Sequence, residues 1–232
     1  METNTVTIVP AAGAGVRMGT GRAKQFLEIE GVPILGLTLK ALNAAALLDA
    51  IIVVVPEEDV NFCRESIVGP LKLDKVIDVV KGGARRQDSV RIGIEASGGR
   101  YGFVMIHDGV RPFVDEEIIK RVLEVAKSSG AASAGLKIKE TVKEVDDNRN
   151  VVRTCDRSRI WKVQTPQAFI YDDIIEAHRR ALRDGWDDAT DDSLLVERLG
   201  LRVIMVEGSE KNIKVTTPFD LHFAEFLLKN EH

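Results

Sequence analysis

The chain has 232 residues and a formal net charge of −4, with 44% hydrophobic and 29% charged residues. A small negative charge argues against a protein that coats nucleic acid, and the apolar content is too high for a disordered chain. No apolar run approaches the roughly 20 residues of a membrane span. Composition and length predict a single domain over residues 1–232, with no nucleic-acid or membrane partner.

The cysteines and the N-terminal segment favour a cytoplasmic protein. Cys63 and Cys155 match no metal-binding or redox spacing. The first residues lack the basic segment and the long apolar stretch of a signal peptide. We therefore expect reduced thiols and a cytoplasmic location.

Short β-branched runs alternate with amphipathic helical patterns along the chain. Five apolar runs predict buried strands at residues 6–9, 51–55, 76–80, 103–106 and 202–206. Apolar residues at helical spacing predict helices around residues 118–126, 174–182 and 219–227. Asp115 or an adjacent carboxylate supplies the start of the first of these helices, and Phe219, Phe223, Phe226 and Leu227 form the apolar stripe of the last. The alternation predicts an α/β fold with a doubly wound, mostly parallel, Rossmann-like sheet.

A glycine-rich loop at residues 10–19 follows the first predicted strand, where α/β folds bind ligands. Small residues let backbone N–H groups approach phosphate oxygens. Met18 stands where a dinucleotide fingerprint needs glycine, and the Gly-Lys-Ser/Thr of a Walker A loop is absent. Arg17 lies within the loop and Lys24 follows it. The pattern fits either an anion-binding loop or a flexible segment with two solvated cations.

Two more loops follow predicted strands. Residues 82–89 connect the third strand to a helix, for which Ser89 is a candidate N-cap. His107 and Asp108 end the fourth strand, again at a ligand-binding edge of the sheet. Asp108 could serve a ligand or cap the next turn.

Residues 137–159 interrupt the alternation with a polar, β-branched and turn-rich sequence. It predicts a β-hairpin that is too polar to form its own core. Because an isolated hairpin is marginal in water, we expect this β-arm to pack on another surface. Residues 137–159 are therefore a predicted dimerisation element within the single domain.

Two polar features favour structural roles. The acidic run at residues 187–192 predicts a solvated, negatively charged start of a helix over residues 193–199, and no metal site. His178 lies on an apolar helix stripe and is predicted to be a packed side chain.

The loop pattern Ala-Ala-Gly-x-Gly-x-Arg-Met, followed by Lys-Gln-Phe, resembles the signature of nucleotidyltransferases that act on polyol phosphates. Further matches extend over nearly the whole chain, at residues 82–90, 107–112, 156–157, 165–167, 190–191 and 212–216. Each motif alone is weak, but their number and order are specific. The sequence therefore resembles the polyol-phosphate cytidylyltransferase family, and within it the enzymes for 2-C-methyl-D-erythritol 4-phosphate in non-mevalonate isoprenoid synthesis.

The resemblance implies a nucleotidyltransferase sheet, with Mg²⁺ as cofactor, CTP and a polyol phosphate as substrates, and CDP-methylerythritol and pyrophosphate as products. The attacking group is a phosphate oxygen, so no Ser, Cys or His nucleophile is needed. Two like charges about 4 Å apart repel by about 4 kcal/mol at an effective dielectric near 20. Fixed cations, Mg²⁺ and positioning must offset that repulsion.

The family's functional residues carry over onto matching positions of this sequence. The implied catalytic residues are Arg17, Lys24, Arg157 and Lys214. The implied CTP contacts are Ala11, Ala12, Gly13, Ala14, Gly15, Gly83, Arg86, Ser89 and Gly109. The implied acceptor contacts are Asp108, Arg111, Thr141, Thr165 and Thr190, and whether Asp108 faces the polyol or Mg²⁺ stays open. The family usually has an acidic residue where Ala84 stands.

The resemblance also implies active sites shared between subunits. Arg157 lies at the end of the β-arm, and the family's arm reaches a neighbouring site. We expect a C₂ homodimer in which Thr141, Arg157 and Thr165 are contributed across the interface.

Three alternatives remain open. A ribitol-5-phosphate cytidylyltransferase would share most of these loops and differ in its acceptor pocket. A non-catalytic, nucleotide-binding regulatory domain would not need cations at both reacting phosphates. An NAD-dependent oxidoreductase is disfavoured by Met18 and by the lack of an acidic residue about 20 positions later.

Overall fold

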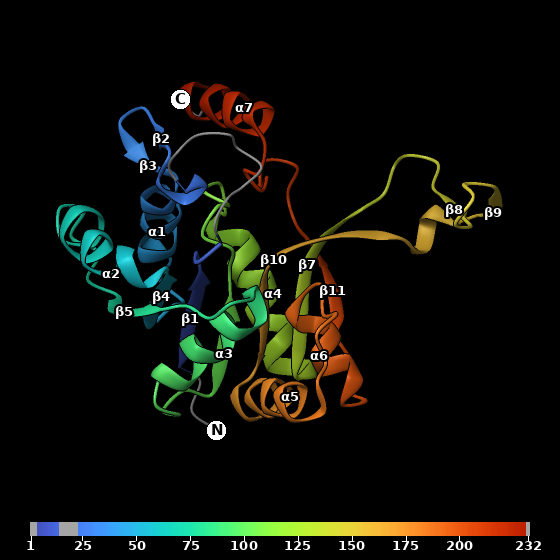
Figure 1. Cartoon of the computed structure of the whole chain (residues 1–232), viewed down its shortest axis with the longest axis horizontal. Coiled ribbons are helices and arrows are strands. Elements are labelled where there is room, and N and C mark those ends of the chain that lie inside the picture. The colour runs from blue at the N-terminus through green and yellow to red at the C-terminus, as the bar shows by residue number, and fades with distance from the viewer. Residues whose placement is uncertain (1–3, 14–22, 231–232) are drawn as a thin grey trace.

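The computed structural model describes residues 4–13 and 23–230, and its central element is a seven-stranded sheet (Figure 1). The strand order is β11-β7-β10-β6-β1-β4-β5. Neighbouring strands are parallel except where β10 pairs with β6 and with β7. The predicted α/β fold with a mostly parallel sheet is confirmed.

Four of the predicted strands are confirmed as β1 (Thr5–Pro10), β4 (Ala50–Val55), β5 (Val76–Lys81) and β6 (Phe103–Ile106). The run at residues 202–206 overlaps β11 (Ile204–Glu207), which begins two residues later than expected and ends one residue later. Strands β7 (Ala131–Lys137) and β10 (Trp161–Ile170) were not predicted from the sequence. These two strands hold small or polar residues, so neither forms a continuous apolar, β-branched run.

Helices cover both faces of the sheet. The α-helices of the described residues are α1 (Ile34–Ala44), α2 (Val60–Phe62), α3 (Arg86–Ala96), α4 (Glu116–Ser129), α5 (Tyr171–Asp184), α6 (Asp192–Arg198) and α7 (Pro218–Lys229), and all but α7 lie beside the sheet. The Asp115 side chain caps α4, as predicted, by accepting a hydrogen bond from the Ile118 N–H. Within the described ranges, every helix is too short or too polar to cross a membrane.

Alternate residues of each strand enter two separate cores. In β4, Ile51, Val53 and Val55 pack on the face covered by α1 and α4. Ile52 and Val54 pack on the opposite face, with residues of α3 and α5. This alternation is the two-sided burial expected for strands of a doubly wound sheet.

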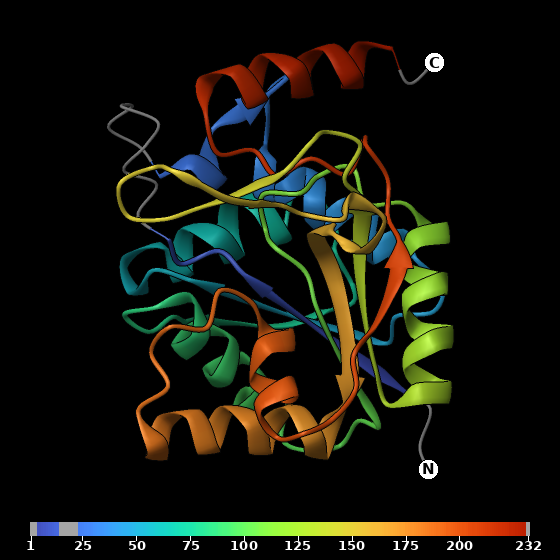
Figure 2. The ribbon, with the colours of Figure 1, turned by 90° about the vertical axis from the view of Figure 1, so that its right-hand side faces the viewer.

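A third, smaller core lies beneath α7 and beside the hairpin β2 (Glu28–Ile29) and β3 (Val32–Pro33). Figure 2 shows α7 at one end of the molecule and α5 at the other. Ala224 is the buried residue of α7, and its small side chain lets the helix lie close to the core. The predicted phenylalanine stripe is wrong, because Phe219, Phe223 and Phe226 are 77%, 40% and 59% exposed.

The β-arm forms the hairpin that the sequence predicts. Strands β8 (Lys143–Val145) and β9 (Val151–Thr154) pair antiparallel and project away from the sheet (Figure 1). The side chains of Val145, Val151 and Val152 are at least half exposed. Within this chain, the hairpin therefore has no core of its own.

Helix α3 packs closely on the sheet at Gly93, so Gly93→Ala should destabilise the fold. An added Cβ would lie 2.5 Å from Ile8 Cγ2 and 2.9 Å from Val54 Cγ2, and both neighbours are fully buried. Overpacking of this kind costs about 1–3 kcal/mol of unfolding free energy, which urea denaturation measures. Gly36→Ala in α1 is the matched control, because its nearest contacts begin at 3.1 Å and are side-chain ends. Equal stability of the two variants would contradict the prediction.

Candidate active site

Two adjoining cavities lie at the carboxyl ends of β1, β5 and β6. The first cavity has a volume of about 290 Å³ and is lined by Pro10, Ala11, Ala12, Gly13, Lys24, Gln25, Gly83, Ala84, Arg85, Arg86, Ser89, Asp108, Val110 and Lys214. The second cavity, of about 240 Å³, is lined by Arg86, Asp108, Arg111, Val163, Gln164, Thr165, Gln167, Thr190, Asp191 and Lys214. The two cavities meet at three charged residues that line both, Arg86, Asp108 and Lys214.

Asp108 is the centre of the charged residues at this junction. Its Oδ1 lies 3.2 Å from Arg86 Nε, and its Oδ2 lies 2.9 Å from Lys214 Nζ and 3.4 Å from Arg111 Nε. Burial raises the pKa of Asp108, but attraction to these three cations outweighs burial and holds the pKa well below its usual range. Asp108 is therefore a carboxylate at neutral pH, and three cations are held around it.

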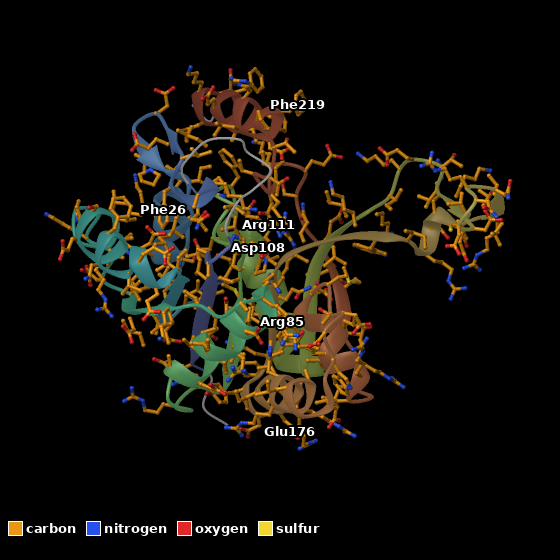
Figure 3. The ribbon with its side chains drawn as sticks, in the orientation of Figure 1. Phe26, Arg85, Asp108, Arg111, Glu176 and Phe219 are labelled. Atoms are coloured by element: carbon orange, nitrogen blue, oxygen red, sulfur yellow. The ribbon has the colours of Figure 1, made fainter. Side chains whose placement is uncertain are left out.

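The three cations come from separate segments of the chain. Arg86 begins α3, Arg111 lies in the turn after β6, and Lys214 follows β11. Arg111 and Asp108 lie near one another at the centre of the molecule (Figure 3). Arg111 Nη1 donates to the carbonyl oxygen of Asn212 at 2.9 Å, which fixes the backbone two residues before Lys214.

His107 and Thr165 form a hydrogen-bonded support for Asp108. Thr165 Oγ1 accepts a hydrogen bond from the Asp108 N–H at 3.0 Å and lies 3.3 Å from His107 Nδ1. His107 Nε2 lies 3.0 Å from the carbonyl oxygen of Arg111. Burial lowers the pKa of His107 to about 4, so its ring is neutral at pH 7. In the His-Asp-Gly motif, the Asp108 carboxylate is therefore held by uncharged, hydrogen-bonded neighbours.

Ser89 connects α3 to the loop after β5 and is not the N-cap that the sequence predicts. The N-cap of α3 is Arg85, whose N–H donates to the side chain of Asp88. Ser89 lies one turn inside the helix, where its Oγ accepts a hydrogen bond from the Gly83 N–H at 3.1 Å. A Cβ at Gly82 would clash with the Cβ of Ala12, so glycine lets the loops after β1 and β5 approach each other.

The acidic run at residues 187–192 is only partly the solvated helix start that the sequence predicts. Asp191 is the N-cap of α6, as a helix start requires, and its Oδ1 accepts from the Leu194 N–H. Asp192 is 1% exposed, and its Oδ2 accepts from Arg86 Nη1 at 2.7 Å. The prediction that Asp192 is solvated is wrong. Arg86 reaches it from α3, more than 100 residues away in sequence. The prediction that His178 is packed is confirmed, since it is 1% exposed.

Most of the residues implied by the family resemblance meet at the two cavities. The first cavity contains Ala11, Ala12, Gly13, Lys24, Gly83, Arg86 and Ser89, and the second contains Arg111, Thr165 and Thr190. Arg86, Asp108 and Lys214 line both. Gly109 lines neither, and instead packs where an added Cβ would lie 2.9 Å from Ala11 Cβ. Ala14, Gly15 and Arg17 lie outside the described residues.

Two implied acceptor-site residues are not near these cavities. Thr141 is exposed on the β-arm, and Arg157 lies in a short helix, Arg157–Arg159, where its Nη1 donates to the carbonyl oxygen of Lys139 at 2.8 Å. Neither residue lines a cavity of its own chain. Thr165 was expected to contribute across the interface. In this structure its Oγ1 accepts a hydrogen bond from the Asp108 N–H of its own chain.

Several polar residues of the site were not predicted from the sequence to belong to it. These are Gln25, Arg85, Gln164, Gln167, Asp191 and Asp192. Gln167 belongs to the Thr-Pro-Gln motif, and its Nε2 donates to Asp191 Oδ2 at 2.7 Å. That motif was the available signal for Gln167, whereas the pairing of Asp192 with Arg86 has no local sequence pattern.

Comparison with known proteins places the chain in one family. The family model for 2-C-methyl-D-erythritol 4-phosphate cytidylyltransferase (IspD) matches residues 5–230. A protein of that name from Syntrophus aciditrophicus is 48% identical, over 100% of this chain and 98% of its own length. Another, from Geobacter metallireducens, is 43% identical and covers 97% of each chain.

Solved structures agree with the sequence comparison. The 4-diphosphocytidyl-2C-methyl-D-erythritol synthase of Anaerococcus prevotii superposes with a TM-score of 0.87 at 32% identity, covering 98% of this chain and 96% of its own. The 2-C-methyl-D-erythritol 4-phosphate cytidylyltransferase of Thermus thermophilus gives a TM-score of 0.74 at 35% identity, covering 99% and 100%. The chain is therefore an enzyme of the 2-C-methyl-D-erythritol 4-phosphate cytidylyltransferase family.

Proposed function

We propose that the first cavity binds CTP and the second binds the phosphate of 2-C-methyl-D-erythritol 4-phosphate. The observation that carries this assignment is the junction at Arg86, Asp108 and Lys214, which both cavities share. Two reacting phosphates would meet there, within reach of cations from three segments of the chain. Small residues of the loop after β1 line the other side of the first cavity, where backbone N–H groups can approach a triphosphate.

In the proposed reaction, an oxygen of the acceptor phosphate forms a bond to the α-phosphorus of CTP. The bond between that phosphorus and the oxygen bridging to the β-phosphate breaks, and pyrophosphate leaves with the electron pair. The nucleophile is already an anion, so no protein base needs to remove a proton. Lys24 and Arg17 are assigned to the charge that develops at the α-phosphate, where preorganised cations have their largest effect.

Lys214 and Arg157 are assigned to the acceptor phosphate. Lys214 is paired with Asp108 at 2.9 Å, and its side chain is 38% exposed. An arriving phosphate would compete with Asp108 for this ammonium. Arg157 cannot assist within its own chain, because it lies on the β-arm away from both cavities.

We infer that Mg²⁺ accompanies the triphosphate. Magnesium is commonly held by one or two carboxylates together with substrate phosphates. Among the residues that the structure describes, no group of three metal-ligating side chains is present, and Asp108 is the carboxylate that lines both cavities. This donor set fits a magnesium ion held by Asp108 and CTP. When bound, the metal would neutralise charge on the phosphates.

We also propose a single domain over residues 1–232 that dimerises through the β-arm, residues 137–159. The exposed valines of the hairpin support this assignment, because they have no apolar partner in their own chain. In a C₂ dimer the arm would bring Arg157 and Thr141 to the partner's second cavity. A cytoplasmic location remains a prediction from the sequence.

Measuring pyrophosphate release from CTP tests the acceptor. We expect turnover with 2-C-methyl-D-erythritol 4-phosphate, much slower turnover with ribitol 5-phosphate, and loss of activity when EDTA removes Mg²⁺. Faster release with ribitol 5-phosphate would favour the alternative acceptor. Binding of CTP without release of pyrophosphate in the presence of either acceptor would favour the non-catalytic regulatory domain.

Lys24→Ala should lower kcat by about 10²–10³-fold, as for the loss of another preorganised charge stabiliser. Lys24 lines the first cavity, and the variant removes a cation from the side where the triphosphate would lie. Lys40→Ala is the control, because Lys40 is exposed on α1 and lines neither cavity. Steady-state kinetics measure kcat of both variants. A decrease in kcat of less than tenfold for Lys24→Ala would contradict the role of Lys24.

Mixed dimers test whether the β-arm completes the partner's site. Arg157→Ala and Lys214→Ala should each give a nearly inactive homodimer. After random mixing, half of the dimers combine both chains, and each has one intact site, so activity should return to about a quarter of the wild-type value. Lack of recovery in dimers whose exchange is verified by tagging would exclude sites shared in this way.

A further inference from the structure

We propose that Asp192 is a positioning residue for Arg86, and that His178 holds Asp192 in turn. Asp192 would fix the guanidinium at the junction of the two cavities, where Arg86 meets the reacting phosphates. This inference rests on the proposed contact of Arg86 with CTP. It assigns a role in the reaction to two buried residues that line neither cavity.

The Arg86 guanidinium is held at two of its nitrogens by different carboxylates. Nη1 donates to Asp192 Oδ2 at 2.7 Å, and Nε donates to Asp108 Oδ1 at 3.2 Å. Because a guanidinium is a rigid planar fork, two such anchors fix its orientation as well as its position. The Arg86 side chain is 31% exposed, so part of it still faces the cavities while its anchors are buried.

The two anchors differ in their access to ligands. Asp108 lines both cavities and shares its Oδ2 between Lys214 and Arg111. A phosphate, a hydroxyl or Mg²⁺ entering the site would therefore compete for Asp108 or its cations. Asp192 is 1% exposed and lines neither cavity, so its bond to Arg86 is not open to that competition. Asp192 is the anchor that persists when substrates bind.

His178 contacts the second oxygen of Asp192. Its side chain is fully buried on α5, and Nε2 lies 3.2 Å from Asp192 Oδ1. Arg86 hydrogen-bonds to Oδ2, whereas His178 Nε2 lies beside Oδ1 without the geometry of a hydrogen bond, so His178 packs against the carboxylate and limits its movement. Supporting residues of this kind in metal sites change affinity or activity by about 10–100-fold when they are removed.

A double-mutant cycle tests the inference. The variants are Asp192→Asn, Arg86→Gln and the combination, and the readout is kcat/KM for CTP at saturating acceptor. We expect Asp192→Asn to lower kcat/KM by about 10–100-fold. In the Arg86→Gln background, the same change should have less than about a twofold effect, because Asp192 then has no guanidinium to position.

The matched control is Asp187→Asn. Asp187 pairs with the neighbouring Arg85, is 71% exposed, and lines neither cavity. We expect kcat/KM of this variant to stay within about twofold of the wild type, since exposed pairs contribute little. An equal loss in Asp187→Asn and Asp192→Asn would overturn the specific role of Asp192.

Two outcomes separate this inference from the function on which it rests. If Arg86→Gln keeps wild-type kcat/KM, the proposed contact of Arg86 with CTP fails, and the positioning role fails with it. If Arg86→Gln is impaired and the Asp192 effect adds to it in full, Asp192 acts through the fold and the inference alone is overturned. Should Asp192→Asn not fold, His178→Gln replaces it in the cycle, with a smaller loss expected that also disappears in Arg86→Gln.

Discussion

The site depends on one buried carboxylate, Asp108, that holds cations from three segments of the chain together. Without it, Arg86, Arg111 and Lys214 would place like charges side by side in a partly buried region, where repulsion is only weakly screened. Removing one partner from a buried ion pair typically costs roughly 3–5 kcal/mol, because the remaining charge stays desolvated. The carboxylate thus lets the protein assemble cations before any phosphate is present.

The fold explains why Asp108 is in place. β6 lies in the middle of the sheet between β1 and β10, so its carboxyl end is held by neighbours on both sides. The antiparallel strand β10 brings Thr165 under the Asp108 backbone. The ring of His107 completes this support. Because burial keeps the ring neutral, it adds no positive charge beside the cations around Asp108. The reactive groups lie on loops, but a central strand positions them.

The sequence predicts the parts of the molecule whose physics is local. Apolar runs identified β1, β4, β5 and β6, and the alternation of strands and helices predicted the sheet. β7 and β10 were missed because their burial comes from close packing of small residues and from polar pairs, which leave no apolar periodicity. The exposed face of α7 was misassigned because both faces of that helix carry apolar residues, and the buried face is the one where Ala224 packs together with Leu221, Leu227 and Leu228.

The same limit applies to the site. Motifs predicted most of the residues that line the two cavities, since the motifs at residues 10–19, 82–90 and 107–112 begin at the end of a strand or in the loop after it. Asp192 was misread because its five neighbours in the acidic run gave no sign of a partner on another helix. Long-range ion pairs are set by how strands and helices are arranged in space, and a local pattern does not contain that arrangement.

Local charge explains how a chain with a net charge of −4 can serve two anionic substrates. Among the described residues that line the two cavities, five are cations and two are carboxylates. The negative excess therefore lies elsewhere, and a partly enclosed cleft focuses the field of its own charges. Asp108 keeps this excess of cations stable without substrate, whereas Asp192 neutralises Arg86 from the side that no ligand reaches. One carboxylate can exchange partners with a phosphate while the other holds its arginine, so the site can bind and release anions without losing its geometry.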